Sequence, residues 1–296
     1  MAICYQDVKM LWEARVRGVI FKDTLTIGHQ SLVLYPAEIK LLRKVYYDKF
    51  PKSSVKLLEN YKYRDYADSF LYDFLGVTSL GIIDYSKYEG ANIIHDLNQL
   101  VPENLWERFD AVIDCGSLEH IFNFPVAIAN LMKMLKVWGS IFITTPSNNL
   151  CGHGFYQFSP ELMFRIFSDL NGFKLGKVVL LETVYPSIEL TSNRNAYVAT
   201  DPAIVRKRVG LITKKPVMMI VEAKKLFDAP LFSRSPLQSD YLSLWKQHEE
   251  QTIHTGIRNV MRIIYNNLPL VFRTRIQGYR EKKRFSLSNS EFYIRL

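Results

Sequence analysis

Three aspartates lie at or near the carboxyl ends of consecutive short apolar runs, where they can bind a ligand. They are Asp84, Asp96 and Asp114. In an open α/β sheet, ligands bind outside the carboxyl ends of the strands, and an acid at the end of the second strand can hold the hydroxyls of a ribose. Aspartate also ends strands because it favours turns. Turn formation explains any one of the three, but three in succession indicate a crevice that binds a nucleoside.

The elements that position these residues alternate between strands and helices. Short apolar runs bounded by polar residues are typical of buried strands, whereas apolar residues at a spacing of 3.6 are typical of helices. Runs that are apolar on both faces suit a parallel sheet covered by helices. Seven strands are predicted in this way, at residues 55–59, 79–84, 91–97, 109–115, 140–146, 177–184 and 217–223. Their alternation with helices predicts an α/β protein.

The chain divides into three predicted regions. Residues 1–50 form an N-terminal cap of helical and β segments, and residues 51–223 form the α/β domain, with an insertion at about 185–214. Residues 224–296 contain a Pro-containing linker, a helix and a basic extension.

The formal charge of +9 comes mostly from the C-terminal end of the chain. Residues 258–296 carry nine Lys and Arg against two Glu, which leaves only +2 on the other 257 residues. A basic protein suggests an anionic partner such as nucleic acid, but the predicted α/β domain is nearly neutral. We therefore interpret the basic end as solvated surface or a segment that docks on acidic protein surface. Nucleic acid is an alternative partner that the sequence does not favour.

Composition and motifs exclude several classes of protein. A hydrophobic fraction of 48% excludes disordered and collagen-like chains. An odd number of cysteines without a CxxC pair excludes a disulfide framework and a cysteine zinc site. The same cysteine usage suits a reducing compartment, so a cytoplasmic protein is expected. No apolar run is long enough to span a membrane. Serine-hydrolase and P-loop motifs are absent. His29 and His95 have no spaced partner ligands, so no metal site is predicted.

The segment 109–146 resembles the class I S-adenosylmethionine-dependent methyltransferases. In that family the fourth strand begins with Phe-Asp and is followed by a Leu-Glu-His turn, a helix and a Leu-Lys-Pro-Gly-Gly-like turn. The corresponding residues here are Phe109-Asp110, Leu118-Glu119-His120 and Leu135-Lys136-Val137-Trp138-Gly139. The later segment 153–163, HGFYQFSPELM, resembles the His…Phe-Ser/Thr-Pro-Glu segment of many small-molecule methyltransferases.

This resemblance covers about residues 55–223 and implies a Rossmann-like fold with a seven-stranded, mostly parallel sheet. It also implies S-adenosylmethionine as cofactor and a small-molecule acceptor. By position, Asp84 would bind the ribose hydroxyls, Asp96 with Leu97 the adenine edge, and the turn 114–117 the methionine end. The implied cofactor-binding residues are Glu59, Asp84, Asp96, Leu97, Asp114, Cys115, Gly116 and Ser117.

Two features depart from the family pattern. The glycine-rich loop, whose missing side chains let backbone amides approach a cofactor, is expected after Glu59, but the next eleven residues contain no glycine. In addition, only about eight residues separate Asp84 from the next strand, whereas a parallel crossover needs about a dozen, so the helix there is predicted to be vestigial or missing. Either Tyr61, Tyr63 and Arg64 form a different floor for the cofactor, or the site has decayed.

Methyl transfer to a hydroxyl needs alignment of the reacting atoms and a base. His153 is the predicted base, because it is flanked by glycines, follows the fifth strand and titrates near neutral pH. Loop capping or a structural hydrogen bond is the alternative role. His120, at a predicted helix start, is expected to pack rather than to react.

Three functions follow from these observations. The first is a methyltransferase that acts on a small molecule, with a sugar or glycan precursor as one candidate. The second is a non-catalytic methyltransferase-like module with no cofactor cavity between Glu59 and Asp84. The third is a nucleic-acid methyltransferase that uses the basic tail. A cavity that touches both Asp84 and the turn 114–117 would favour an enzyme. The sequence makes no prediction about the oligomeric state.

Overall fold

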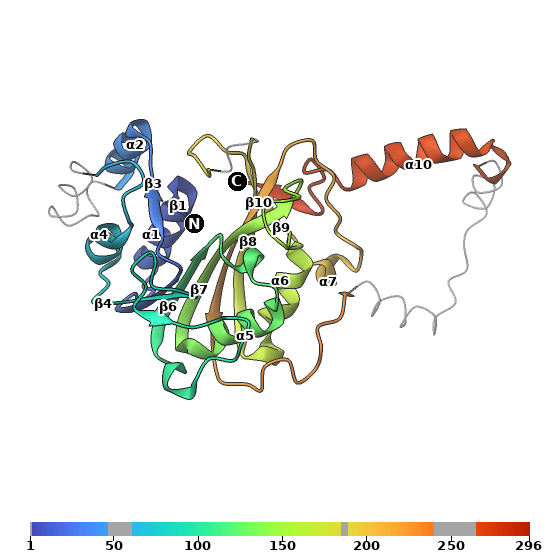
Figure 1. Ribbon diagram of the computed structural model, residues 1–296. Helices are drawn as coiled ribbons and strands as arrows, with labels where there is room; N and C mark the ends of the chain where they lie inside the picture. The colour runs from blue at the N-terminus through green and yellow to red at the C-terminus, as the bar shows by residue number, and fades with distance from the viewer. Residues whose placement is uncertain (1, 47–60, 185–188, 240–264) are drawn as a thin grey trace.

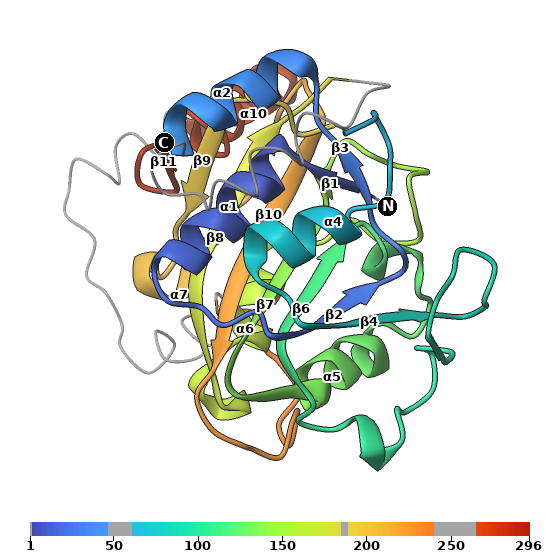
Figure 2. The same ribbon diagram turned by 90° about the vertical axis from the view of Figure 1, so that its left-hand side faces the viewer.

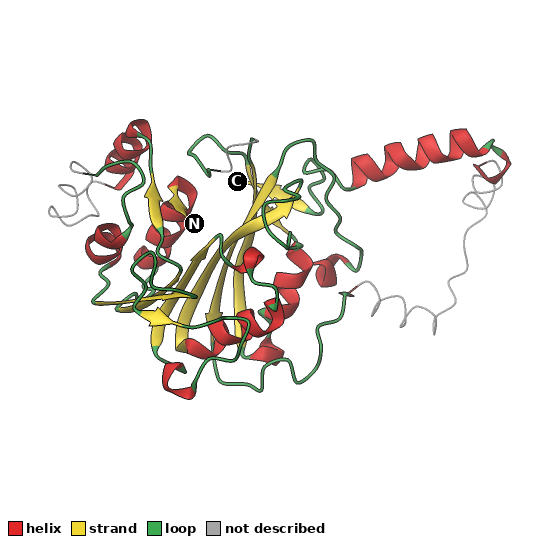
Figure 3. Ribbon diagram, in the orientation of Figure 1, coloured by secondary structure: helices red, strands yellow, loops and turns green. Residues whose placement is uncertain are grey.

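The computed structural model describes residues 2–46, 61–184, 189–239 and 265–296, and its centre is a nine-stranded mixed sheet (Figure 3). In spatial order the strands are β11 (Tyr293–Arg295), β9 (Ala196–Ala199), β8 (Phe173–Glu182), β10 (Val217–Lys225), β7 (Leu135–Asn148), β6 (Phe109–Cys115), β2 (Asp23–Ile27), β4 (Ser79–Asp84) and β5 (Ile93–Ile94). A separate parallel pair joins β1 (Ala2–Cys4) to β3 (Ser31–Val33).

Five neighbouring strands, from β5 through β4, β2 and β6 to β7, are parallel. Numbered along the chain, their spatial order is 3-2-1-4-5, which is the order of the Rossmann fold. Next to them β10 runs antiparallel between β7 and β8. The predicted α/β class is therefore confirmed, but the predicted number of seven strands is wrong. Three strands of the sheet, β2, β9 and β11, were not among the predicted seven. Of these, β9 and β11 have only four and three residues and are too short to stand out in the sequence.

The central strand of the parallel set is β2, not the predicted strand 55–59, which lies outside the described residues. Two of its five residues are buried threonines, Thr24 and Thr26, so the run lacks the apolar character expected of a central strand. The sequence places it within the predicted N-terminal cap, outside the predicted α/β domain. Because β2 and β11 both belong to the main sheet, the structure does not separate the sheet from the rest of the chain at residues 50 and 223.

Helices cover both faces of the sheet (Figure 2). One face packs against α1 (Tyr5–Val16), α4 (Asp68–Phe70) and the π-helical turn Leu71–Leu75, with α2 (Pro36–Tyr46) beside them, and the other against α5 (Phe124–Met134) and α6 (Pro160–Ile166). Alternate residues of β6 point to opposite sides. Ala111 and Ile113 belong to the core under α1, and Val112 belongs to the core under α5. This alternation is what a strand buried on both faces requires.

The crossover from β4 to β5 contains no helix, as predicted. The side chain of Asn92 forms hydrogen bonds to the backbone of β4 there, as a neighbouring strand would. Its Oδ1 accepts the amide of Ile82 at 2.8 Å and its Nδ2 donates to the carbonyl of Leu80 at 2.8 Å. These bonds hold the short β5 beside β4 without a full crossover.

The C-terminal region has two parts with different surroundings. Helix α10 (Leu270–Arg284) projects from the body of the protein and buries none of its residues (Figure 1). The chain then returns, buries Phe292 and Tyr293 in the core and adds β11 to the sheet. Most of the predicted helix 241–268 lies outside the described residues. Before them, the predicted insertion supplies β9 and the short α7 (Pro202–Val205). None of the described helices combines the length and the apolar character that a membrane crossing demands.

Candidate functional site

A cavity of about 520 Å³ lies at the carboxyl ends of β2 and β4 and is called here the strand-end cavity. Four of the predicted cofactor residues line it, namely Asp84, Asp96, Leu97 and Ser117. The cavity therefore touches both Asp84 and the turn 114–117. Its position outside the ends of parallel strands is where α/β folds bind ligands.

Gly28 forms part of the cavity wall directly after β2. Its φ of +69° lies in the left-handed region, which glycine adopts without strain. Its amide donates to the carbonyl of Ile83 at 2.8 Å and thus ties the ends of β2 and β4 together. Sequence reasoning missed this residue, because it placed the glycine loop after Glu59, which lies outside the described residues. The signal available in the sequence was the run DTLTI ended by glycine.

The two acids of the strand-end cavity are held by backbone amides. Oδ1 of Asp84 accepts the amide of Tyr85 at 2.6 Å. Oδ1 of Asp96 accepts the amide and the side-chain NH₂ of Asn98 at 2.9 and 2.8 Å. The bonds to Asn98 lower the pKa of Asp96, because they stabilise its ionised form. Asp96 therefore presents a fixed carboxylate to the cavity at neutral pH.

The turn 114–117 divides its residues between two cavities. Asp114 is fully buried, and its oxygens accept the amides of Ser117 and Leu118 at 2.9 and 3.3 Å. It therefore shapes the turn. The resemblance implies a cofactor-binding role for Asp114, but the residue does not line the strand-end cavity. Ser117 does line it and donates its hydroxyl to the carbonyl of Ile27 at 2.9 Å. Cys115 and Gly116 instead line a second cavity.

The second cavity has a volume of about 430 Å³ and is called here the histidine cavity. It is lined by Asp7 from α1, Thr144 from β7, the turn 115–116, Glu119 and both His120 and His153. His120 lines the strand-end cavity as well, so the two cavities meet at this side chain. The sequence predicts a packing role for His120 at a helix start, but the structure leaves its side chain exposed in the lining of both cavities.

Glu119 and His153 face each other in the histidine cavity. Glu119 is fully buried, and its Oε2 accepts the hydroxyl of Thr145 at 3.2 Å. Its Oε1 lies 3.8 Å from Nε2 of His153, whose side chain is 32% exposed. Burial, with the nearby Asp114 charge, raises the pKa of Glu119, and burial lowers the pKa of His153. The predicted site residue His153 is thus in a cavity, beside a buried carboxyl.

The backbone fixes this pair. The amides of Phe155 and Tyr156 both donate to the carbonyl of Glu119, at 2.8 and 3.2 Å. A side chain at Gly154 would approach the same carbonyl to 2.9 Å, so only glycine fits there without movement. The glycine and the two amides therefore hold the loop that carries His153 against Glu119.

Asp7 is a buried acid of the histidine cavity that the sequence did not single out. Its oxygens accept the hydroxyl of Thr144 at 2.5 Å and the amide of Cys4 at 2.8 Å. Complete burial raises the pKa of Asp7 to about 6, although both hydrogen bonds oppose the shift. The only sequence signal was an acid within an otherwise apolar helix face.

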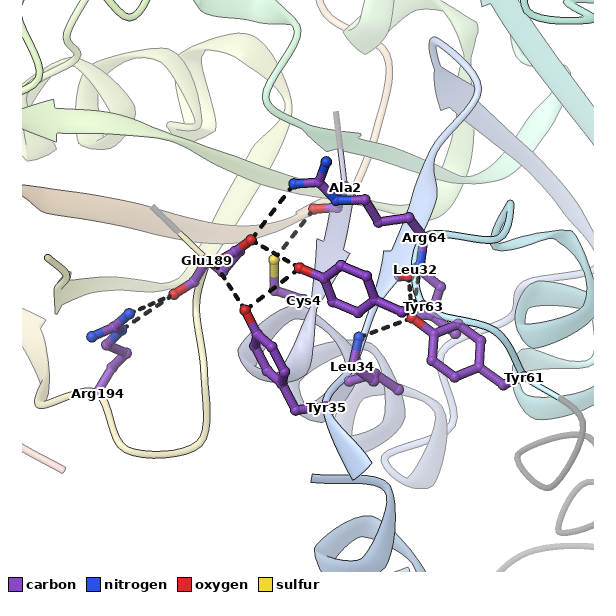
Figure 4. Close-up of polar contacts among 10 residues, drawn as sticks. All are labelled: Ala2, Cys4, Leu32, Leu34, Tyr35, Tyr61, Tyr63, Arg64, Glu189 and Arg194. Atoms are coloured by element: carbon purple, nitrogen blue, oxygen red, sulfur yellow. Dashed lines mark hydrogen bonds and ion pairs between the residues drawn. The ribbon is translucent and has the colours of Figure 1, made fainter. Parts of the chain in front are cut away.

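Glu189 lines the histidine cavity and contacts several polar side chains there (Figure 4). It accepts the hydroxyls of Tyr35 and Tyr63 at 3.2 and 3.1 Å and lies 3.7 Å from Arg64. The hydroxyl of Tyr61 bonds to the backbone of β3. Tyr61, Tyr63 and Arg64 are therefore not among the residues that line the strand-end cavity, and they neither fill it nor form its floor.

The described residues contain one group of three side chains that can hold a metal ion, namely Glu119, His120 and His153. One ligand atom of each lies within 4.8 Å of the others. No metal site was predicted from the sequence, because only His29 and His95 were compared with ligand spacings and neither has a spaced partner. In the structure His29 bonds to Asp68 and to the carbonyl of Glu89, which explains that histidine as a structural one.

No protein-family model and no curated protein matches the sequence. The fold is similar to solved structures of S-adenosylmethionine-dependent methyltransferases. One from Thermotoga maritima has 11% identity and a TM-score of 0.39, over 75% of this chain and 90% of that chain. The N-methyltransferase NodS from Bradyrhizobium japonicum, solved with S-adenosylhomocysteine, has 11% identity and a TM-score of 0.38, over 74% and 86%.

A third similar structure is 1,6-didemethyltoxoflavin-N1-methyltransferase from Burkholderia thailandensis, solved with 1,6-didemethyltoxoflavin and S-adenosylhomocysteine. It has 10% identity and a TM-score of 0.36, over 75% of this chain and 78% of that chain. These neighbours belong to the family that the sequence resembles. The chain's own strand order, with five parallel strands and an antiparallel β10 in a nine-stranded mixed sheet, gives it a Rossmann-like α/β fold.

Proposed function

We propose that this protein is an S-adenosylmethionine-dependent methyltransferase that acts on a small acceptor, with a sugar or glycan precursor as the first candidate. One observation carries the proposal. A cavity at the carboxyl ends of parallel strands touches both Asp84 and Ser117 and meets a second cavity at His120. A cofactor in the first cavity and an acceptor in the second would have their reacting atoms brought together at that residue.

The strand-end cavity suits a nucleoside cofactor. Its 520 Å³ lie within the range of small-molecule sites. Gly28 leaves room for a ligand against the backbone, Asp84 is placed for the ribose hydroxyls, and Asp96 with Leu97 is placed for the adenine. Bound there, S-adenosylmethionine supplies a methyl group already activated by its sulfonium. The protein then has to align that group with the acceptor.

The histidine cavity suits an acceptor that is rich in hydroxyl or amino groups. Asp7, Glu119 and Glu189 all line it, and carboxyl groups accept hydrogen bonds from such donors. This lining supports a sugar as acceptor. His153 is the proposed catalytic residue, because its half-buried ring reaches the same cavity and can contact an acceptor hydroxyl.

Calorimetry of the full chain with S-adenosylhomocysteine tests the cofactor part of the proposal. We expect one site with a Kd on the order of 1–100 µM, as is common for enzyme ligands. No heat of binding at millimolar ligand, on protein shown to be folded by circular dichroism, would overturn it. Transfer of a labelled methyl group is then measured with neutral sugars, nucleotide sugars and small amines. Transfer only to amines would overturn the sugar as acceptor.

A further inference from the structure

We propose that Glu119, His120 and His153 bind a divalent transition-metal ion at the junction of the two cavities. The inference rests on the proposed function for the identity of the two cavities, but the metal site itself is built from this chain's own side chains. The three residues come from the turn after β6 and the loop after β7, and their ligand atoms lie within 4.8 Å of one another.

An unpartnered buried oxygen points into this site. Oε1 of Glu119 receives no hydrogen bond from any of the residues that the structure describes, although the side chain is fully buried. Polar groups buried without a partner are costly, so native proteins rarely keep one. Nε2 of His153 lies 3.8 Å from this oxygen, too far for a hydrogen bond. A bound cation would satisfy the oxygen.

The charge around the site also favours a cation. Asp114 and Glu119 are both fully buried near each other, and neither forms an ion pair with Lys or Arg within the described part of the chain. Buried acids are normally paired with cations or coordinate metals. A divalent ion on Glu119 would compensate this charge, with which no Lys or Arg of the described residues forms an ion pair.

The donor set selects the kind of metal. Two imidazoles and one carboxylate suit Zn²⁺, Co²⁺ and similar transition metals, whereas Mg²⁺ and Ca²⁺ prefer oxygen ligands only. Zinc bonds of about 2.0–2.2 Å place ligand atoms roughly 3.4 Å apart in a tetrahedral site. The Glu119 and His153 atoms, at 3.8 Å, are close to that spacing. The exposed His120 ring would have to rotate to bring its nitrogen to the same spacing.

The surroundings hold the carboxylate in place. The hydroxyl of Thr145 donates to Oε2 of Glu119, which leaves Oε1 for the metal, and such bonds to ligand residues orient them and strengthen metal binding. Three protein ligands leave a fourth position open, which is the pattern of sites where a metal meets a substrate. Since all three ligand residues line the histidine cavity, an open position would face that cavity. An acceptor oxygen would bind there, and His153 would then be a metal ligand instead of the predicted base.

Titration of the EDTA-treated full chain with Co²⁺ tests the site. We expect one equivalent to bind, with visible absorption bands typical of four- or five-coordinate cobalt, and Zn²⁺ to remove these bands by displacement. Replacing a ligand in Glu119→Gln or His153→Ala should weaken Co²⁺ binding by at least 100-fold. Cys151→Ser is the matched control, because this exposed thiol lies two residues before His153 and is not part of the site. It should bind Co²⁺ as the parent protein does.

The outcomes separate the metal site from the proposed function. Loss of the bands in Cys151→Ser, or their persistence in both ligand variants, would overturn the metal site. So would the lack of any stoichiometric Co²⁺ or Zn²⁺ binding by the parent protein, which needs no variant to fold. Calorimetry with S-adenosylhomocysteine on the same parent sample reports on the cofactor separately. Cofactor binding without metal overturns only this inference, and metal without cofactor binding overturns only the proposed function.

Discussion

The two cavities use acidic residues in opposite ways. In the strand-end cavity, Asp96 is held ionised by the amide and side chain of Asn98, which lower its pKa. In the histidine cavity, Asp7 and Glu119 are fully buried, and burial raises the pKa of both. The first arrangement suits steady recognition of hydroxyl and amino donors of a ligand. The histidine cavity holds buried acids whose protonation depends on pH and on what is bound beside them.

The difference follows from which segments build each cavity. The strand-end cavity is formed by the ends of β2, β4 and β6, where the backbone supplies amides and the side chains remain open to solvent. The histidine cavity is closed by α1 and by the loop that follows β7, so its acids are covered by other parts of the chain. Hydrogen bonds from Asn98 therefore stabilise the charge of Asp96 in the open cavity, whereas burial destabilises the charge of Asp7 and Glu119 in the covered one.

The largest expected effect concerns Asp7. Its folded pKa of about 6 exceeds the ordinary value of 3.8, so the folded state binds the proton more tightly than the unfolded state. The Asp7 contribution to the free energy of unfolding is therefore fully present below about pH 4 and is lost as pH rises through about 6. A displacement of this size corresponds to roughly 3 kcal/mol. Asp7→Asn cannot ionise and should lack this contribution.

Urea unfolding of the parent and of Asp7→Asn between pH 4 and pH 7 checks this prediction. In Asp7→Asn the side-chain oxygen can still accept the amide of Cys4, and the side-chain NH₂ can donate to the hydroxyl of Thr144, so any change in these two bonds is the same at every pH. Its stability relative to the parent should rise with pH. Parallel curves for the two proteins would contradict the raised pKa of Asp7.

The next largest effect is expected at Asp84 in the strand-end cavity. Asp84→Ala removes the carboxylate proposed for the ribose hydroxyls. A hydrogen bond to a charged group contributes about 1.5–3 kcal/mol, so the Kd for S-adenosylhomocysteine should rise roughly 10- to 100-fold. Calorimetry measures the change. Asp169→Asn, an exposed acid outside both cavities, is the control and should bind like the parent. Equal affinities in all three proteins would remove Asp84 from the cofactor site.

A smaller effect is expected at the glycine after β2. Gly28→Val places a branched side chain on a residue that lines the strand-end cavity and has a φ of +69°, which costs about 1–2 kcal/mol of folding stability. Gly18→Val is the matched control, because Gly18 also has a positive φ but faces open space. Both variants should melt at lower temperature, and only Gly28→Val should bind S-adenosylhomocysteine more weakly, by about tenfold. Weaker binding by both would point to a general loss of structure.

Much of the strand-end cavity was predictable from the sequence. The strands that end at Asp84 and Cys115 have the predicted bounds, because both runs are apolar on two faces and end in turn-forming residues. The acid positions at strand ends then follow from the fold. The histidine cavity was harder to predict from the sequence, since Asp7, Arg64 and Glu189 come from segments far apart in the chain. Nothing in their local spacing indicates that they meet.

The first strand shows why one element was misplaced. The run 55–59 is apolar and β-rich and precedes a helical pattern, so it fits the local signals better than β2 does. The buried hydroxyl of Thr24 donates to the carbonyl of Phe21 at 2.8 Å, a contact that makes a polar residue acceptable in a central strand. Such a partner is visible only in the fold. Because the first strand was assigned to residues 55–59, the glycine was expected after Glu59, whereas Gly28 follows β2.

The smallest effect is expected far from both cavities, on α10. This helix buries no residue and projects from the body (Figure 1), and charges beyond a Debye length of about 8 Å are largely screened in physiological salt. Changing Lys282, Lys283 and Arg284 to Gln should alter the Kd for S-adenosylhomocysteine less than twofold. The substitutions are preferable to truncation, because Phe292 and Tyr293 beyond the helix are buried. Salt-sensitive RNA binding that disappears in this variant would instead support the nucleic-acid methyltransferase.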